Sequence, residues 1–332
     1  MFDFVSLLRA LTGAHGVSGQ EEAVTSVIKE AAAPWADEME RDVLGNLLVR
    51  KKGKGRRVLV SAHMDSVGLV ATYVSQEGMI RVGAIGGVVP GDVLHHRVLF
   101  QGGAQGVICR SGKGDSKSLT VSDLYVDIGA RDGAEAAARV QIGETAALLG
   151  ETHTAGSRVI SPYLDDRAGC LVMLLALQQM KNSPNDVTFA FTVQEEVGLR
   201  GAKTAAFAVE PDYGIAVDVT TSVNWEEPEK SKGTSVLGGG AAIKVMDRSV
   251  ICAPQVVSLL TRLAEERGIP AQKDIIKAGG TDAGPIQRSR AGVLTGGISI
   301  PLRNIHTPGE MADLGDIEAC AALLTAFLEY PL

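Results

Sequence analysis

Aromatic residues and cysteines are scarce in this chain, and each scarcity argues against a class of protein. Only 4% of the 332 residues are Phe, Tyr or Trp, too few for the stacked aromatic platforms that bind single-stranded nucleic acid or sugars. The four cysteines are scattered, with no Cys-x-x-Cys spacing, which favours reduced, buried thiols over disulfides or a zinc knuckle. No apolar run is long enough to span a bilayer, and Asp3 lies where a signal peptide has basic residues. The sequence therefore predicts a cytoplasmic protein.

Positive charge is also in the minority, because the formal net charge is −7. An acidic protein repels nucleic acid and anionic membranes, so neither is expected as a partner. The one basic cluster, Arg50–Arg57, precedes an expected strand and indicates a solvated hairpin turn rather than a phosphate site. The chain has no His-Glu-x-x-His, Gly-x-Ser-x-Gly or Gly-x-x-x-x-Gly-Lys-Ser/Thr motif. Because these short motifs are absent, any catalytic site has to be assembled from residues that are distant in the sequence.

Hydrophobic periodicity divides the chain into two kinds of segment. In the first and last parts, apolar helices alternate with short strands, which predicts an α/β layer fold with a largely parallel sheet. Between them, short β-like runs broken by glycines predict a small β-barrel or sandwich with little helix. We therefore expect a three-layer α/β/α catalytic domain, residues 1–66 plus 159–332, interrupted by an inserted small β-barrel domain at residues 67–158.

Individual elements follow from capping signals and apolar runs. Ser18 and Glu21 have the spacing of a capping box, which predicts a helix through about Ala33. Strands are expected at Asn46–Arg50, Val58–Ala62, Asp186–Val193, Tyr213–Val217 and Gly296–Pro301. Further helices are expected at Asp166–Asn182, Gly201–Val209, Ala253–Arg267, Thr281–Arg288 and Gly315–Glu329.

Histidine and carboxylate side chains lie close to the ends of several of these elements. The carboxyl ends of parallel strands meet at one edge of a sheet, so side chains that are distant in the sequence converge there. Imidazoles and carboxylates are the groups that hold pairs of divalent cations in hydrolases. The candidates are His63, Asp165, Glu195, Glu196, Asp218 and His306. The sequence therefore predicts a di-metal hydrolase centre.

Each candidate also has an ordinary structural interpretation. His63 could be a surface histidine beside an acid, although Asp65 is near enough to orient a metal-binding imidazole. Asp165 could be a helix cap instead of a carboxylate that bridges two cations. For Asp218, the interpretation as a metal ligand and the interpretation as a turn or helix-cap residue are about equally supported. The adjacent pair His95-His96 faces opposite ways if it lies on a strand, which favours a surface role.

The adjacent acids Glu195 and Glu196 are open to two interpretations as well. Both could be solvated in a loop, but the apolar run before them would carry them to the edge of the sheet. If they point in different directions, one can bind a metal while the other takes a proton from water.

Taken together, these motifs resemble the glutamyl and deblocking aminopeptidases, di-metal exopeptidases that build tetrahedral shells of twelve subunits. The matching segments are Ala62–Asp65, Leu164–Gly169, Glu195–Gly198, Val217-Asp218 and His306–Pro308. The resemblance extends over almost the whole chain, including the inserted β domain. The family's usual acid after the first motif is Ser66 here, which leaves the preferred N-terminal residue open.

The resemblance implies a role for each candidate residue. The metal ligands would be His63 and Asp218 for one cation, Glu196 and His306 for the other, and Asp165 bridging both. Glu195 would be the general base, and Asp65 would support His63. The cations would be zinc or cobalt, with manganese possible, and the Asp165–Asp166 peptide bond would be cis.

The implied activity is that of an aminopeptidase that removes N-terminal residues from short peptides with a water bridging two divalent metals. Alternatives on the same fold are a di-metal deacylase or carboxypeptidase. A different class is a catalytically silent peptide-binding homologue, but such a protein would normally have lost a ligand or Glu195. The low aromatic content disfavours a glycan-cleaving enzyme. The inserted domain is expected to make subunit contacts, giving a homo-oligomer, most simply a dodecamer.

Overall fold

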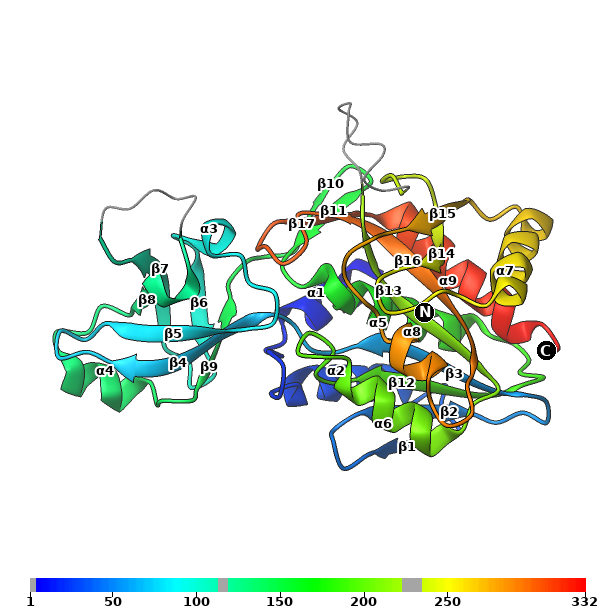
Figure 1. Cartoon of the computed structure of the whole chain (residues 1–332), viewed down its shortest axis with the longest axis horizontal. Helices are drawn as coiled ribbons and strands as arrows, with labels where there is room; N and C mark the ends of the chain where they lie inside the picture. Colours follow the sequence, from blue (N-terminus) through cyan, green and yellow to red (C-terminus); the bar gives the residue numbers. More distant parts are fainter. Residues whose placement is uncertain (1–3, 113–118, 223–234) are drawn as a thin grey trace.

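The chain folds into a domain built on an eleven-stranded sheet and a separate closed barrel (Figure 1). The computed structural model describes residues 4–112, 119–222 and 235–332. Short parts of the expected domains, residues 1–3, 113–118 and 223–234, lie outside the described residues. The expected fold class is confirmed, because helices cover a mixed sheet whose central strands are parallel.

The centre of the large sheet consists of four neighbouring parallel strands. In spatial order they are β12 (Asp186–Thr192), β3 (Arg57–His63), β13 (Tyr213–Thr221) and β16 (Leu294–Arg303). Antiparallel strands extend it on one side, β2 (Leu47–Lys51) and β1 (Glu38–Arg41), and on the other, β17 (Glu310–Asp313), β11 (Arg158–Ser161) and β10 (His153–Ala155). β14 (Ala241–Met246) pairs with β16 and with β15 (Ala271–Ile275).

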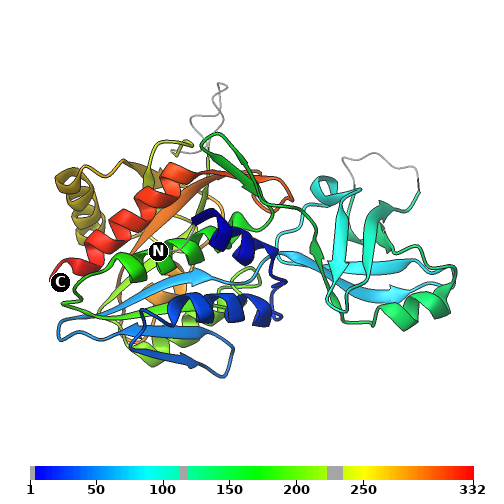
Figure 2. The same ribbon diagram turned by 180° about the vertical axis from the view of Figure 1, so that it is seen from behind.

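Helices cover both faces of this sheet, as Figures 1 and 2 show. One face carries α1 (Phe4–Gly13), α2 (Glu22–Ala32), α5 (Leu164–Gln179) and α9 (Leu314–Glu329), with α7 (Pro254–Arg267) packed against α9 and β14. The other face carries α6 (Arg200–Val209) and α8 (Ala283–Gln287). Alternate residues of β3 serve the two cores, because Val58 and Val60 pack on the α5 side and Leu59 on the α6 side. Among the described residues, no helix is both long and apolar enough to cross a membrane.

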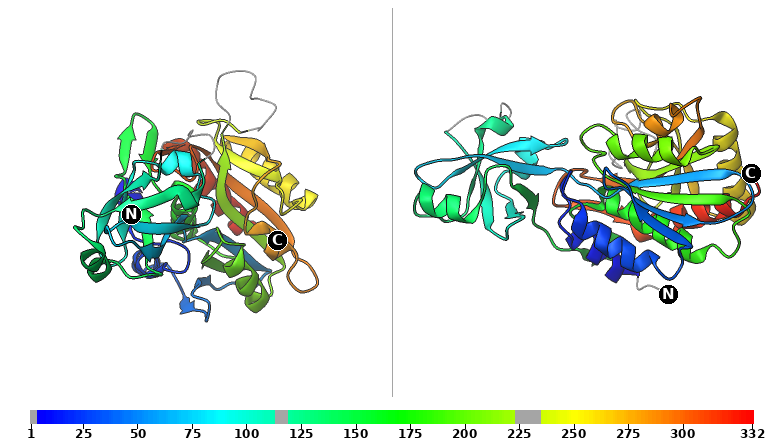
Figure 3. Two further views of the ribbon diagram at one scale, coloured as in Figure 1. Left: turned by 60° about the vertical axis from the view of Figure 1, so that its left-hand side comes forward. Right: turned by 90° about the horizontal axis from the view of Figure 1, so that it is seen from below.

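The inserted β domain is a closed six-stranded barrel with a hydrophobic core of its own. Its strands are β4 (Gly68–Val74), β5 (Ile80–Ile85), β6 (Arg97–Phe100), β7 (Gln105–Arg110), β8 (Leu124–Asp127) and β9 (Thr145–Leu148). Two short helices, α3 (Pro90–Val93) and α4 (Gly133–Arg139), accompany them. Figure 3 shows the barrel set apart from the sheet domain. Because β10 already pairs in the large sheet, that sheet resumes a few residues before the expected boundary at residue 158.

One local prediction, the capping box of Ser18 and Glu21, is wrong. Helix α2 begins at Glu22 with no side-chain hydrogen bond to its first turn. The Ser18 hydroxyl donates instead to Asp65 Oδ2 at 2.6 Å, and Glu21 Oε1 accepts the Gln194 N–H at 3.3 Å. Ser18 therefore has a tertiary partner in place of the local one, whereas Glu21 combines a tertiary partner with a local one, the Gly19 N–H at 2.7 Å.

Candidate metal centre

The parallel strands end at the same edge of the sheet and bring the predicted side chains together there. His63 is the last residue of β3, and Glu195 follows β12 by three residues. Ala216 of β13 pairs with Ser61 of β3, so Asp218, two residues further along, lies level with His63. Glu196 comes from the same loop as Glu195, Asp165 from the start of α5, and His306 from the turn between β16 and β17. The order of the strands thus assembles the site from segments up to 243 residues apart, from His63 to His306.

Asp165 lies between the two histidines. Its Oδ1 is 3.1 Å from His63 Nε2, and its Oδ2 is 3.4 Å from His306 Nε2. His63 Nε2 is also 3.9 Å from Asp218 Oδ1, and His306 Nε2 is 3.3 Å from Glu196 Oε1. The five side chains therefore form two clusters that share one carboxylate, the arrangement expected of a group that bridges two cations.

The chemistry of these donor atoms fits a pair of divalent cations. Asp165 Oδ1 and Glu196 Oε1 are buried, and apart from the Nε2 atoms of His63 and His306 they have no hydrogen-bond partner among the described residues, which is costly for a carboxylate unless it binds a cation. Donor atoms of His63, Asp165 and Glu196 lie within 4.8 Å of one another, as do those of His63, Glu195 and Asp218. Imidazole nitrogens and carboxylate oxygens suit zinc, cobalt and manganese.

The local backbone at Asp165 and Asp166 holds the two acids apart. The peptide bond between them is cis, as expected from the resemblance. The Asp166 carboxylate accepts the backbone N–H of Gly169 at 3.0 Å and the backbone N–H of His63 at 3.2 Å. Asp166 therefore caps the regular part of α5, which leaves Asp165 free to face the histidines.

Main-chain carbonyls orient both histidines. His63 Nδ1 lies 3.1 Å from the carbonyl oxygen of Asp65 and 3.6 Å from Asp65 Oδ1, so the main chain is the nearer support. His306 Nδ1 lies 3.1 Å from the carbonyl oxygen of Gly87, which belongs to the barrel. A proton on each Nδ1 leaves Nε2 available as a metal ligand. The barrel supplies none of the candidate ligands, yet it orients one of them.

Two acids of the centre, Glu310 and Asp282, were missed in the sequence. Glu310 accepts the backbone N–H groups of Asp165 at 3.0 Å and His306 at 2.8 Å, which ties the two ligand-bearing segments together. Asp282 accepts the Thr192 hydroxyl at 2.7 Å, and burial raises the pKa of its carboxyl to about 6. The only sequence signal for Glu310 was its position as an acid four residues after His306.

Crowded, buried acids make the metal-free centre sensitive to pH. Burial raises the pKa of the Glu195 and Asp218 carboxyls well above their usual range. Burial alone would lower the pKa of His306, but Asp165 and Glu196 outweigh it and raise that pKa to about 11. A group whose pKa is raised by folding binds protons better in the folded state, so its contribution to stability is lost as the pH rises.

We expect the chelated protein to unfold at progressively lower temperature as the pH rises from about 5 to about 8. The buried carboxyls lose their contribution above about pH 4, the pKa of an unfolded acid. The His306 contribution declines between about pH 6.5 and about 11. Cations need deprotonated ligands, so added zinc should raise Tm more at the higher pH. A Tm difference between metal-loaded and chelated protein that shrinks with rising pH would contradict this.

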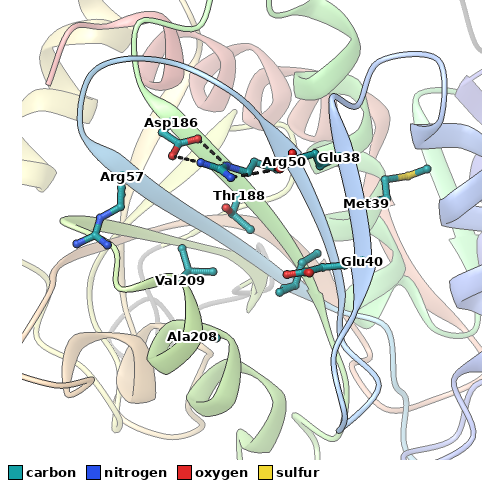
Figure 4. A pocket seen from close by; sticks show the side chains of 10 residues that line it. Glu38, Met39, Glu40, Arg50, Arg57, Asp186, Thr188, Ala208 and Val209 are labelled. Carbon is teal, nitrogen blue, oxygen red and sulfur yellow. Dashed lines mark hydrogen bonds and ion pairs between the residues drawn. The ribbon is translucent and has the colours of Figure 1, made fainter.

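A groove of about 620 Å³ lies at the opposite end of the strands (Figure 4). Its walls include Arg57 and Asp186, the first residues of β3 and β12, and none of the candidate ligands. Arg50 donates to Asp186 at 2.6 Å and to Glu38 at 3.2 Å across it. Several basic residues of the cluster Arg50–Arg57 are therefore paired with surface acids, as expected for a solvated hairpin.

Comparisons of sequence connect this chain with aminopeptidases. The family model described as M42 glutamyl aminopeptidase matches residues 45–323. A protein of Acetivibrio thermocellus to which aminopeptidase activity is attributed is 46% identical over 323 residues, 97% of each chain. The lysyl aminopeptidase of Pyrococcus furiosus is 33% identical over 97% of this chain and 96% of that relative.

Comparisons of structure extend the similarity to both domains. The aminopeptidase APDkam598 of Desulfurococcus kamchatkensis superposes with a TM-score of 0.95 at 36% identity, covering 98% of this chain and 94% of that one. The TET1 peptidase of Pyrococcus horikoshii, which can assemble into a tetrahedron or a large octahedral shell, superposes with a TM-score of 0.88 at 30% identity. That match covers 98% of this chain and 99% of the other.

Proposed function

The chain belongs to the M42 family of glutamyl aminopeptidases and is a metal-dependent aminopeptidase, and from this premise we propose how its residues share the reaction. The observation that carries the proposal is the pair of clusters that share Asp165. The proposed ligands are His63 and Asp218 for one cation, Glu196 and His306 for the other, and Asp165 for both. Two divalent cations, zinc or cobalt with manganese possible, suit this set of nitrogen and oxygen donors.

Glu195 is the proposed general base. The cations held by these residues would polarise the peptide carbonyl and lower the pKa of water. Glu195 is buried beside His63 and Asp218, where its carboxylate can take the proton of the attacking water and pass it to the leaving amine. Its own N–H donates to Asp65 Oδ1 at 2.9 Å, so its backbone is held independently of the substrate.

The proposed substrates are short peptides with a free N-terminal amine. The acidic groups around the centre favour a cationic α-amine close to the scissile bond. The family model carries a glutamyl name and one matched relative a lysyl name, so the preferred N-terminal residue has to be measured on this chain.

A panel of aminoacyl chromogenic substrates tests this proposal. After chelation, activity should return with zinc, cobalt or manganese, and a free α-amine should be required. Cleavage of N-acetylated peptides in preference to free-amine peptides would favour the deacylase alternative, and release of C-terminal residues would favour the carboxypeptidase. Tight peptide binding without turnover under every metal would point to a silent homologue.

Assembly into a dodecamer through the barrel is the proposed quaternary structure. The TET1 peptidase of Pyrococcus horikoshii supports it, because that protein can form a tetrahedron. Exposed apolar side chains on the barrel, Tyr73 at 54% and Ile142 at 68%, offer surface that association would bury. Light scattering of the metal-loaded protein should give twelve times the chain mass of 34.7 kDa, and a monomer at micromolar concentration would contradict it.

A cytoplasmic location is proposed on the basis of the cysteines. All four are free thiols, and three of them are buried, as in proteins of reducing compartments. Fractionation of cells that express the protein at its natural level tests the location.

A further inference from the structure

Three consecutive backbone N–H groups in the loop that carries the proposed base all donate to buried carboxylates. Gln194 N–H donates to Glu21 Oε1 at 3.3 Å. Glu195 N–H donates to Asp65 Oδ1 at 2.9 Å, and Glu196 N–H donates to Asp65 Oδ2 at 3.2 Å. Two carboxylates from other parts of the chain, those of Glu21 and Asp65, therefore hold the backbone of this loop in place.

The loop needs this support because its backbone turns sharply. Gln194 has a φ of 57°, a left-handed conformation that residues other than glycine rarely adopt. The turn lets two neighbouring acids point to different clusters. Glu196 lies 3.3 Å from His306 Nε2, whereas Glu195 groups with His63 and Asp218.

Glu21 is itself held firmly beside the loop. Its side chain is buried, and Oε1 also accepts the Gly19 N–H at 2.7 Å. The neighbouring Ser18 hydroxyl donates to Asp65 Oδ2 at 2.6 Å, and the Ser18 N–H donates to the Ser66 carbonyl at 3.2 Å. Both acids that hold the loop are therefore connected through the segment of residues 16–21.

The same segment is fastened to the helix that follows the bridging carboxylate. Arg167 is fully buried, and its guanidinium donates to the carbonyl oxygens of Leu11 at 2.8 Å and Gly16 at 3.3 Å. Arg167 lies two residues after Asp165. The segment thus lies between the Asp165 end of α5 and the loop of Glu195, in contact with both.

We propose that Glu21 is a positioning residue for catalysis, which holds the Gln194 backbone so that Glu195 is aimed at the attacking water. The inference rests on the proposed role of Glu195 as general base. Glu21 acts through the loop, since its carboxylate accepts from backbone N–H groups. A displacement of about 1 Å in a reacting group can cost about 100-fold in rate, so loss of one loop anchor is expected to lower kcat.

Replacement of Glu21 by Ala tests the proposal, with Glu22→Ala as the matched control. We expect Glu21→Ala to lower kcat by about tenfold or more, within the range that misplacement produces, with KM nearly unchanged and two metals retained. Glu21→Gln keeps an acceptor oxygen and should recover most of the activity. Glu22 is exposed and pairs with Arg41 on the surface, so Glu22→Ala should match the wild type.

Several outcomes would overturn the inference. Wild-type kcat in folded Glu21→Ala would do so, and so would a loss of activity that is fully explained by lost metal. If Glu21→Ala does not fold, Glu21→Asp serves instead, because its shorter side chain withdraws the acceptor while keeping the charge, and it should also lower kcat. Glu195→Gln is measured in parallel. An active Glu195→Gln refutes the base assignment itself, whereas an inactive Glu195→Gln with unimpaired Glu21 variants refutes only the positioning role.

Discussion

Replacing Glu195 by Gln should lower kcat by about 10²–10⁴-fold, the usual worth of positioned acid–base catalysis, while both metals remain bound. The amide keeps the size of the side chain and can still form hydrogen bonds, but it cannot accept a proton from water. The loop should keep its shape, because the Glu195 N–H donates to Asp65 through the main chain. Steady-state kinetics with metal analysis of the same sample measures both effects.

The matched control is the neighbouring Glu196→Gln. Glu196 Oε1 lies 3.3 Å from His306 Nε2 and has no hydrogen-bond partner among the described residues, as expected of a ligand. Its replacement should weaken binding of one cation, and added metal should partly restore activity. If instead Glu196→Gln is inactive with both metals bound and Glu195→Gln is active, the two roles are exchanged.

Replacing Asp165 by Asn should abolish activity and reduce the metal content to one cation or fewer per chain. Asp165 lies close to both histidines, at 3.1 Å from His63 and 3.4 Å from His306, and a neutral amide cannot offset the repulsion between two cations. Loss of a group that only orients a ligand already costs about 10–100-fold in metal affinity. Loss of the shared ligand is expected to cost more, which titration of the chelated protein with zinc or cobalt would measure.

Asp282→Asn is the control for this experiment. Asp282 is buried in the same centre, but it accepts the Thr192 hydroxyl and belongs to neither group of candidate ligands. Asparagine can keep that hydrogen bond, so two cations should still bind. Equal loss of metal in Asp165→Asn and Asp282→Asn would show that Asp165 has no bridging role.

The sequence was sufficient for the candidate ligands because each lies next to a strongly apolar element. The runs before His63, Glu195 and Asp218 predicted strands, and parallel strands end at a common edge. The fold class followed from the same alternation. The division of roles among the acids came from family resemblance, because spacing alone cannot distinguish a base from a ligand.

The residues that hold the ligands were not predictable in the same way. Ser18 and Glu21 have the spacing of a local cap, yet Ser18 donates to Asp65, 47 residues away, and Glu21 accepts from Gln194, 173 residues away, as well as from the nearby Gly19. Glu310 supports Asp165 across 145 residues. Such contacts depend on tertiary packing, which outweighs the local preference of a short motif.

The hydrogen-bonding contact between His306 and the barrel restricts how independently the two domains can change. A Cβ atom on Gly87 would lie 2.9 Å from His306 Nδ1, and one on Gly86 would lie 3.2 Å from the Cβ of Glu196. Both positions therefore require glycine for the loop to approach the ligands this closely. A chimaera that exchanged the barrel for that of a relative would have to bring the same two glycines and the same carbonyl. Exchange of the barrel would thus also change the support of His306 and Glu196, two of the proposed metal ligands.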